Sequence, residues 1–225
     1  MTTGGASIKA ALAQQNHYFN RVINDRKTQA KADLIGHLVN AQVDGAKLSD
    51  SLLRSALELL ISASFQTSTH MLSHCVIQLA RHPDLLQQLR TSPALIPDFV
   101  EEMLRYKPPG HCVFRKTTQA ISLAGISLQK GDVIIGLLAS ANRDPAQFDQ
   151  PENFMMGRHN SKQQLAFGHG IHTCIGATLA RMQVQIALET LLKTFSNISC
   201  PSDDDILWSD SVTIHGPKEL PLTFE

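Results

Sequence analysis

The chain has little of several residue types that mark particular protein classes. Its 225 residues include one tryptophan, two tyrosines and four cysteines, and its 20 basic residues are balanced by 20 acidic ones. A formal net charge of zero argues against nucleic acid as the main partner. No two cysteines have the Cys-x-x-Cys spacing, so we expect neither a disulfide framework nor a four-cysteine zinc site. The cysteines are Cys75, Cys112, Cys174 and Cys200.

Long apolar runs are also missing. The longest, residues 133–141, is interrupted by Gly136 and Ser140 and is much shorter than the roughly 18 residues of a membrane span. The first six residues show no basic segment followed by an apolar run, so no secretory signal is visible. Because 43% of the residues are hydrophobic, the chain can form a core. We therefore expect a cytoplasmic protein with no membrane association, forming one domain over residues 1–225.

The first half of the chain has helical patterns. We expect helices at residues 7–27, from Asp33 to a stop at Gly45, from Ser49 or Asp50 to residues 81–82, and at 84–90 after Pro83. The third of these is about thirty residues long and must cross most of a domain. The clearest pattern is the apolar stripe of residues 95–104, which repeats at steps of three and four and predicts a helix that ends before residues 108–109.

The second half changes character. Short β-like runs at residues 112–118, 121–124 and 132–138 precede a loop at 141–170 that is rich in Asn, Asp, Pro and Gly. A loop of that length within a compact domain is usually functional. A last helix is expected at 175–195, with strand-like pieces near 212–214 and 220–224. The pattern predicts an α+β fold that is mainly α.

One cysteine, Cys174, lies in a sequence context that favours metal ligation by its thiolate. Cys174 comes at the start of the expected last helix, within the segment FGHGIHTCIG of residues 167–176. A helix N-terminus lowers the pKa of a thiol, and glycines allow backbone N–H groups to approach a thiolate. His172 can reach an anionic group beside a metal. Such a thiolate suits an iron porphyrin; the alternative is a buried cysteine in a tight strand–helix turn.

The surrounding pattern resembles a known family. Phe-x-x-Gly-x-His-x-Cys-x-Gly-x-x-Leu-Ala-Arg, from Phe167 to Arg181, is similar to the haem-ligand signature of the cytochrome P-450 superfamily. Glu102 to Arg105 resembles the family's Glu-x-x-Arg, and residues 141–145 (ANRDP) resemble a motif of its soluble bacterial members. The resemblance implies a haem-thiolate monooxygenase or peroxygenase that oxidises a small organic substrate in a biosynthetic pathway.

The resemblance also implies roles for individual residues. Cys174 would be the axial ligand of the iron in haem b, and Arg115 would contact a haem propionate. Other haem-binding positions by this resemblance are Ala63, Phe167, Gly168, His172 and Gly176. Glu102 and Arg105 would form the structural ion pair that holds the loop before the cysteine. Without the resemblance, that pair would be a solvated ion pair that adds little stability.

The long helix carries the implied catalytic residues and two departures from the family. Residues 63–68 (ASFQTS) stand where the family has Ala-Gly-x-(Glu/Asp)-Thr-(Thr/Ser), which makes Ser64, Gln66 and Thr67 the catalytic candidates. Ser64 replaces a glycine and Gln66 replaces the acid. Because an amide cannot relay a proton by gaining and losing one, we expect weak oxygen-dependent turnover. A peroxide-driven or redox-neutral reaction would tolerate the change better.

A third departure concerns the ion pair. Asn153 occupies the place of the arginine that completes the Glu–Arg arrangement in the family, although Arg158 lies nearby.

The resemblance covers only the C-terminal portion of the family fold, with its long distal helix, small sheets and cysteine-ligand loop. We therefore expect a truncated haem domain, and a homodimer or a complementing subunit that covers its exposed apolar faces. A ferredoxin-type protein would be the reductant, or peroxide would replace the reductant and oxygen. Two alternatives stay open: a haem protein with isomerase, cyclase or dehydratase activity, and a non-catalytic haem-binding subunit. His70 and His74 have a two-histidine metal spacing, but a polar helix face or partner contact explains them as well.

Overall fold

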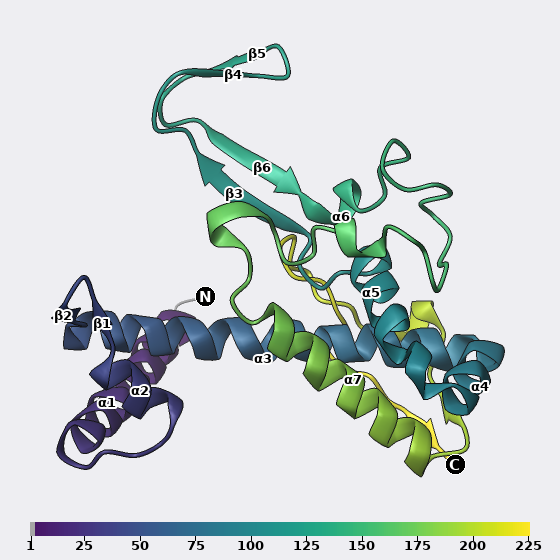
Figure 1. Ribbon diagram of the computed structural model, residues 1–225, viewed down its shortest axis with the longest axis horizontal. Helices are drawn as coiled ribbons and strands as arrows, with labels where there is room; N and C mark the ends of the chain where they lie inside the picture. The colour runs from purple at the N-terminus through teal and green to yellow at the C-terminus, as the bar shows by residue number, and fades with distance from the viewer. Residues whose placement is uncertain (1–2) are drawn as a thin grey trace. The chain divides into compact units, whose positions relative to one another are not determined.

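The computed structural model describes residues 3–225 and is mainly helical with small sheets, as the sequence predicts (Figure 1). The chain divides into two compact units, residues 1–65 and 66–225. The boundary falls within one continuous helix, α3 (Asp50–Arg81). One domain over residues 1–225 stays a prediction. No helix of the described residues is long and apolar enough to cross a membrane.

The N-terminal unit contains two helices and a small hairpin before α3. They are α1 (Thr3–Thr28), α2 (Leu34–Asn40), β1 (Gln42–Val43) and β2 (Ala46–Lys47). Asp33 caps α2, because its carboxylate accepts a hydrogen bond from the Gly36 amide at 2.8 Å. Gly45 does not end this helix. It lies in the turn between β1 and β2 with φ of 78°, a conformation that glycine adopts without steric cost.

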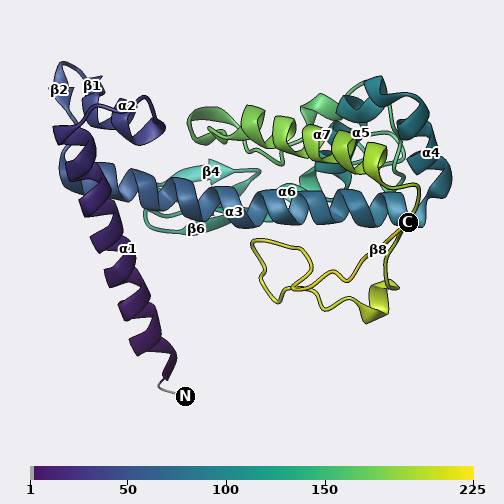
Figure 2. The same cartoon turned by 90° about the horizontal axis from the view of Figure 1, so that it is seen from below.

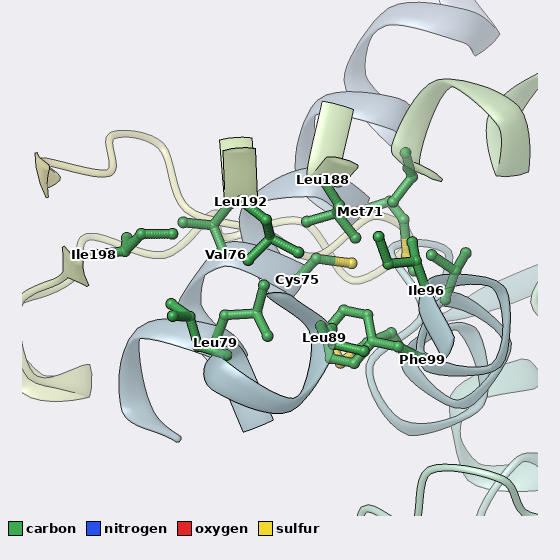
Figure 3. Close-up of a cluster of buried hydrophobic side chains, with 14 of the residues drawn as sticks. Met71, Cys75, Val76, Leu79, Leu89, Ile96, Phe99, Leu188, Leu192 and Ile198 are labelled. Carbon is green, nitrogen blue, oxygen red and sulfur yellow. The ribbon is translucent and has the colours of Figure 1, made fainter. Parts of the chain in front are cut away.

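The C-terminal unit buries its core between helices. The later part of α3 packs with α4 (Pro83–Thr91), α5 (Ile96–Tyr106) and α7 (Ala177–Thr194). Figure 3 shows Met71 and Cys75 of α3 among Ile96, Phe99 and Leu188 of the other helices. The apolar stripe predicted for residues 95–104 is buried from Ile96 onward, and each such side chain contributes about 1.5–3 kcal/mol by leaving water. Figure 2 shows these helices on one side of α3 and the segment after α7 on the other.

The strands form antiparallel pairs. β3 (Cys112–Lys116) pairs with β6 (Val133–Leu137), and β4 (Ile121–Leu123) pairs with β5 (Ile126–Leu128). The sequence interpretation missed β5, which follows a turn at Ala124 and Gly125 with φ of 49° and 81°. At the C-terminus β7 (Ile198–Ser199) pairs with β8 (Thr223–Phe224). The expected strand near 212–214 is only an isolated bridge between Gly110 and Ile214.

The long loop predicted at 141–170 is present. It follows the short helix α6 (Leu138–Ala141) and holds 3-10 turns at η2 (Ser161–Gln163) and η3 (Gly170–His172) before α7 begins. Two further 3-10 turns occur at η1 (Pro93–Leu95) and η4 (Asp203–Asp205). With so little regular structure, side-chain hydrogen bonds from the helices hold this loop in place.

Candidate functional site

Cys174 is an exposed thiol three residues before the first residue of α7. Its amide donates to the carbonyl of Phe167 at 2.9 Å, and its carbonyl accepts from the Ala177 amide at 3.3 Å. The first bond closes residues 167–174 into a loop, and the second connects that loop to the helix. We call residues 167–176 the Cys174 loop. The free N–H groups at the start of this 18-residue helix therefore lie close to the thiol along the chain.

Glycines shape the Cys174 loop. Gly168 and Gly170 have φ of 70° and 78°, the left-handed conformation that side chains rarely adopt. A Cβ atom built on Gly176 would lie 3.8 Å from the Cys174 Sγ, so the backbone at Gly176 lies beside the sulfur. The loop therefore brings main chain, rather than side chains, close to the thiol.

The surroundings of the thiol fit a porphyrin better than a bare metal ion. Ile171 and Ile175 are 98% and 91% exposed, so apolar side chains stand free on both sides of Cys174 along the chain. Within residues described by the structure, no group of three His, Cys, Asp or Glu side chains could hold a metal ion. A single thiol ligand flanked by apolar side chains suits an iron whose other ligands come from a macrocycle.

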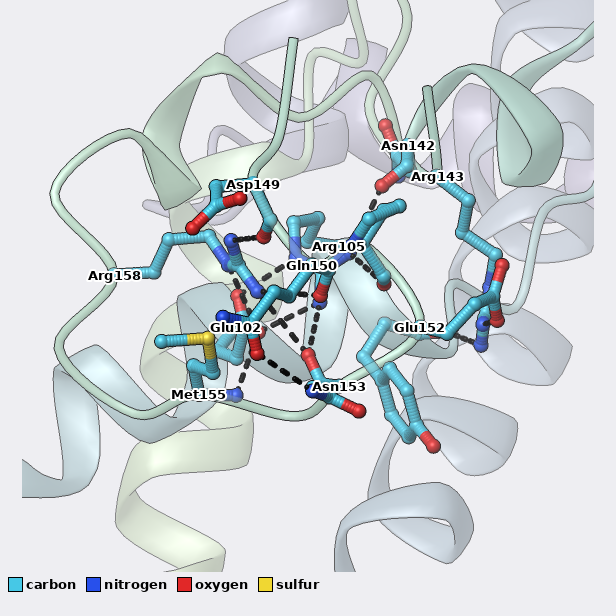
Figure 4. Close-up of polar contacts among 12 residues, drawn as sticks. Glu102, Arg105, Asn142, Arg143, Asp149, Gln150, Glu152, Asn153, Met155 and Arg158 are labelled. Carbon is cyan, nitrogen blue, oxygen red and sulfur yellow. Dashed lines mark hydrogen bonds and ion pairs between the residues drawn. The ribbon is translucent and has the colours of Figure 1, made fainter. Parts of the chain in front are cut away.

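The loop before Cys174 is held by a buried network of Glu102, Arg105 and Arg158, which we call the Glu102 network (Figure 4). The side chains of Glu102 and Arg105 are both 0% exposed. Arg105 donates to the two Glu102 oxygens at 2.8 and 2.7 Å. Arg158 donates from Nε to Glu102 Oε1 at 3.2 Å. The pair is therefore not the solvated ion pair that the residues alone would suggest.

The Glu102 network connects α5 to the long loop through main-chain atoms. Arg105 donates to the carbonyls of Asn142, Pro151 and Asn153 at 3.0, 2.8 and 3.0 Å. Glu102 accepts from the Met155 amide at 2.9 Å. Two guanidinium groups share one carboxylate, and these carbonyl dipoles compensate the remaining positive charge. The loop conformation thus depends on side chains of a helix that precedes it by about forty residues.

Arg158 also corrects the interpretation of Asn153. The Asn153 side chain is exposed and donates to Gln150 Oε1 at 2.9 Å, while its carbonyl accepts from Arg158 at 3.2 Å. Arg158 donates further to the carbonyls of Asp149 and Gln150. The arginine that the sequence lacks at position 153 is thus supplied from position 158.

A small apolar cavity lies between α3 and the Cys174 loop. It measures about 30 Å³ and lies where α3, α5 and α7 meet. Thr67 and Met71 line it from α3, Phe167 from the Cys174 loop, and Ala180 and Arg181 from α7. The structure thus brings the predicted catalytic threonine and the first residue of the Cys174 loop to one cavity.

The other predicted residues lie on the elements expected for them. Gln66 is exposed next to Thr67 on α3. Ser64 and Ala63 belong to the N-terminal unit, where the Ser64 hydroxyl donates to the Ile61 carbonyl at 3.3 Å. Arg115 is exposed on β3 and donates to the Phe114 carbonyl at 2.9 Å. His172 is exposed in η3, two residues before the cysteine.

Sequence reasoning missed the ion pair of Glu101 and Arg181. Two nitrogens of the Arg181 guanidinium group, Nε and Nη2, donate to the buried Glu101 carboxylate. Arg181 was visible as the last residue of the cysteine signature, but its partner lies 80 residues earlier and no local pattern connects them.

Sequence reasoning also missed a stack of aromatic rings beside α3. His215 stacks between His111 and Trp208, with ring centroids 4.9 and 4.8 Å apart, and lies 5.6 Å from His74. Burial lowers the pKa of His74 to about 3 and lowers the pKa of His70 as well. The His74 Nδ1 faces the Lys107 carbonyl at 3.0 Å. His70 and His74 are therefore buried parts of the core, and the described residues give them no third metal ligand.

Comparison with known proteins decides the family. The sequence profile described as "Cytochrome P450" matches residues 4–92 and 94–220 of the chain. The chain belongs to the cytochrome P450 family. The predicted family and fold are thereby confirmed, and the family's cofactor is haem b, iron protoporphyrin IX.

Several similar proteins come from bacteria. Cytochrome P450 107B1 of Saccharopolyspora erythraea is 36% identical over 219 residues, which are 96% of this chain and 54% of the relative. The polyketide biosynthesis cytochrome P450 PksS of Bacillus subtilis is 36% identical over 95% of this chain and 53% of its own length. The structure of cytochrome P450 CYP109Q5 from Chondromyces apiculatus superposes with a TM-score of 0.92 at 36% identity, covering 97% of this chain and 56% of that one. The chain spans about half the length of the curated relatives it matches.

Proposed function

We propose that this chain is a haem-thiolate protein of the cytochrome P450 type that oxidises a small organic substrate as a monooxygenase or peroxygenase. The observation that carries this proposal is the exposed Cys174 thiol at the start of α7, in a loop closed by the Cys174–Phe167 bond. Membership of the family supports the oxidoreductase class. A biosynthetic role is supported by relatives such as PksS, whose name assigns it to polyketide biosynthesis.

The residues of the Cys174 loop would hold the haem. Cys174 would bind the iron, and Phe167, Gly168 and Gly176 would shape the surroundings of its sulfur. Arg115 and His172 are both exposed and carry N–H donors, which suit the two carboxylates of a porphyrin. When bound, the haem supplies an iron whose thiolate ligand favours O–O cleavage.

By the family resemblance, Thr67 would order a water molecule near the bound oxidant. It lines the small cavity between α3 and the Cys174 loop. Its neighbour Gln66 would complete that site. The Gln66 carboxamide can donate and accept hydrogen bonds but cannot carry a proton across, so proton delivery falls to water. This substitution favours peroxide as the oxidant over oxygen with a ferredoxin-type donor. The glutamine at position 66 also supports two alternatives. One is a haem protein with isomerase, cyclase or dehydratase activity, and the other is a non-catalytic haem-binding subunit.

A protein partner belongs to the same proposal. Apolar side chains of the β3–β6 hairpin are at least half exposed: Phe114 50%, Val133 63%, Ile135 52% and Leu137 59%. An apolar surface next to unpaired strand edges usually becomes an interface. We propose a homodimer or a complementing subunit as its cover, in the cytoplasm. Light scattering of the haem-loaded protein tests this, and an active species with the mass of one chain contradicts it.

Turnover with two oxidants tests the chemistry. The haem-loaded protein is supplied with a panel of small organic substrates and either hydrogen peroxide or a ferredoxin, its reductase and oxygen. The proposal expects product with peroxide at a rate above that with the reductant system, and loss of both in Cys174→Ser. Conversion of substrate without any oxidant would establish the redox-neutral alternative. No conversion by a haem-loaded protein under any condition would favour the non-catalytic subunit.

A further inference from the structure

Arg181 of α7 binds the buried carboxylate of Glu101 of α5 through two hydrogen bonds. Its Nη2 donates to Glu101 Oε2 at 3.1 Å and its Nε donates to Oε1, a two-point contact that fixes the plane of the guanidinium group. The Glu101 side chain is 7% exposed and that of Arg181 is 30% exposed. The pair therefore lies at the edge of the core, where it is partly shielded from water and from salt.

The guanidinium group so fixed contacts the Cys174 loop. Its Cζ lies over the Phe167 ring, 4.6 Å from the ring centroid. The Phe167 carbonyl in turn accepts the hydrogen bond from the Cys174 amide at 2.9 Å. A continuous series of contacts thus runs from Glu101 through Arg181 and Phe167 to the main chain of Cys174. Arg181 also donates to the Ala177 carbonyl at 3.5 Å, in the first turn of α7.

This series is separate from the Glu102 network. Glu102 and Glu101 are adjacent, but Glu102 bonds the loop at residues 153–158 through Arg105, Arg158 and the Met155 amide. Glu101 bonds α7 and, through Arg181, the loop at Phe167. The two neighbouring carboxylates of α5 therefore fix the two ends of the segment that leads to the cysteine.

We propose that Arg181, oriented by Glu101, is a positioning residue for the Cys174 thiolate. This inference rests on the proposed haem-thiolate function and goes beyond it, because it names the contact that sets where the sulfur lies. The Glu101 carboxylate neutralises the Arg181 charge, so Arg181 acts through geometry: it holds the Phe167 ring, and Phe167 holds the Cys174 amide. Loss of either member lets the end of the loop move and weakens thiolate ligation.

The test compares variants of the haem-loaded protein by spectroscopy. Arg181→Leu removes the fork and the ring contact, Arg181→Lys keeps the charge but loses the planar fork, and Glu101→Gln removes the carboxylate. Each is expected to lower the fraction of the reduced carbon monoxide complex that shows the thiolate-type Soret band. Each is also expected to release haem to apomyoglobin about tenfold faster, the usual scale for outer contacts of a metal ligand. The double variant Glu101→Gln/Arg181→Leu should be no worse than Arg181→Leu alone, since both act through one contact.

Matched controls come from the same two helices. Asp98→Asn changes an exposed acid of α5, and Lys193→Leu changes an exposed cation of α7. Both should leave the ligation spectrum and the haem release rate unchanged. Thermal unfolding of every variant measures any general loss of stability. Such a loss would leave the Soret band of the folded fraction unchanged, whereas a misplaced Cys174 would alter it.

Two failures have different meanings. If the wild-type protein gives no thiolate-type Soret band, the haem-thiolate function fails and this inference fails with it. If the wild type gives that band and Arg181→Lys and Glu101→Gln give it equally, with unchanged haem release, the positioning role alone is overturned.

Discussion

Arg158 donates to Glu102 from a position five residues beyond the one where the family signature places an arginine. The Nε to Oε1 distance is 3.2 Å, and the two side chains are 3% and 0% exposed. Asn153, at the expected position, contributes its main-chain carbonyl to both arginines of the network. The loop that leads to Cys174 is therefore held by two arginines and one carboxylate despite the substitution at 153.

Removing this arginine should destabilise the C-terminal unit. Arg158→Ala is expected to lower the free energy of unfolding by about 2–4 kcal/mol, because it takes a charged partner from buried Glu102 and a donor from several loop carbonyls. Urea denaturation measures the loss. Lys218→Ala, which breaks the exposed pair with Asp210, should cost less than about 1 kcal/mol. Equal effects of the two variants would show that the buried network contributes no more than a surface ion pair.

Placing an acid at position 66 of α3 should improve use of oxygen. Gln66→Glu introduces a carboxylate that can pass a proton beside Thr67, and we expect about a tenfold increase in product formed per reductant consumed. Product and reductant are measured in the same reaction with oxygen as the oxidant. Ser62→Glu places an acid one turn earlier on an exposed position of α3 and serves as the control. Tight coupling in the wild-type protein would refute the assignment of Gln66 as the cause of weak turnover.

Acidification should destabilise the C-terminal unit through its buried histidines. Burial lowers the pKa of His74 to about 3, so the folded chain keeps this ring neutral. The contribution of the neutral ring to the free energy of unfolding is complete at pH values above 6.5, the ordinary pKa of histidine. It is lost as the pH falls below 6.5, because the unfolded chain then binds protons that the folded chain excludes. For His74 alone the loss between pH 6.5 and pH 5 is about 1.6 kcal/mol.

Burial also lowers the pKa values of His70, His111 and His215, which add to the same slope. Urea denaturation at a series of pH values should therefore show a smaller slope for His74→Gln than for the wild type. His159→Gln, at an exposed position of the long loop, should leave the slope unchanged. An identical slope for His74→Gln would contradict a neutral buried ring at this position.

Gly216 should tolerate no side chain. A Cβ atom there would lie 2.1 Å from Cγ of the buried His70, so Gly216→Ala requires the ring or the C-terminal segment to move. We expect a loss of about 1–3 kcal/mol, the usual cost of overpacking a core. Gly110→Ala is the control, because nothing lies within 4 Å of a Cβ at that position. Thermal unfolding of the two variants compares them directly, and equal midpoints would show that His70 moves at no cost.

The sequence predicted the helices well because their signals are local. The stripe of α5 and the Asp33 cap of α2 each lie within a few residues and were found. The partner strand β5 was missed, since a three-residue strand after an Ala–Gly turn carries almost no periodic signal. The predicted site residues came from a local sequence signature. Their roles in haem binding stay predictions.

The missed contacts depend on tertiary packing. Glu102 and Arg105 have the spacing of any surface pair, and only the loop folded over α5 makes them fully buried. Glu101 and Arg181 are 80 residues apart, and the rings of His74 and His215 come together only when the C-terminal segment returns to α3. Spacing along one helix cannot reveal partners that another segment supplies.

The central claim is that Cys174 is the axial ligand of a haem. The most direct measurement is the absorption spectrum of the reduced carbon monoxide complex of the haem-loaded protein. The wild type is compared with Cys174→Ala and with Cys200→Ala, a control at a partly exposed cysteine elsewhere in the chain. The account predicts a thiolate-type Soret band in the wild type and in Cys200→Ala, and its loss in Cys174→Ala. The same spectrum in Cys174→Ala as in the wild type would contradict it.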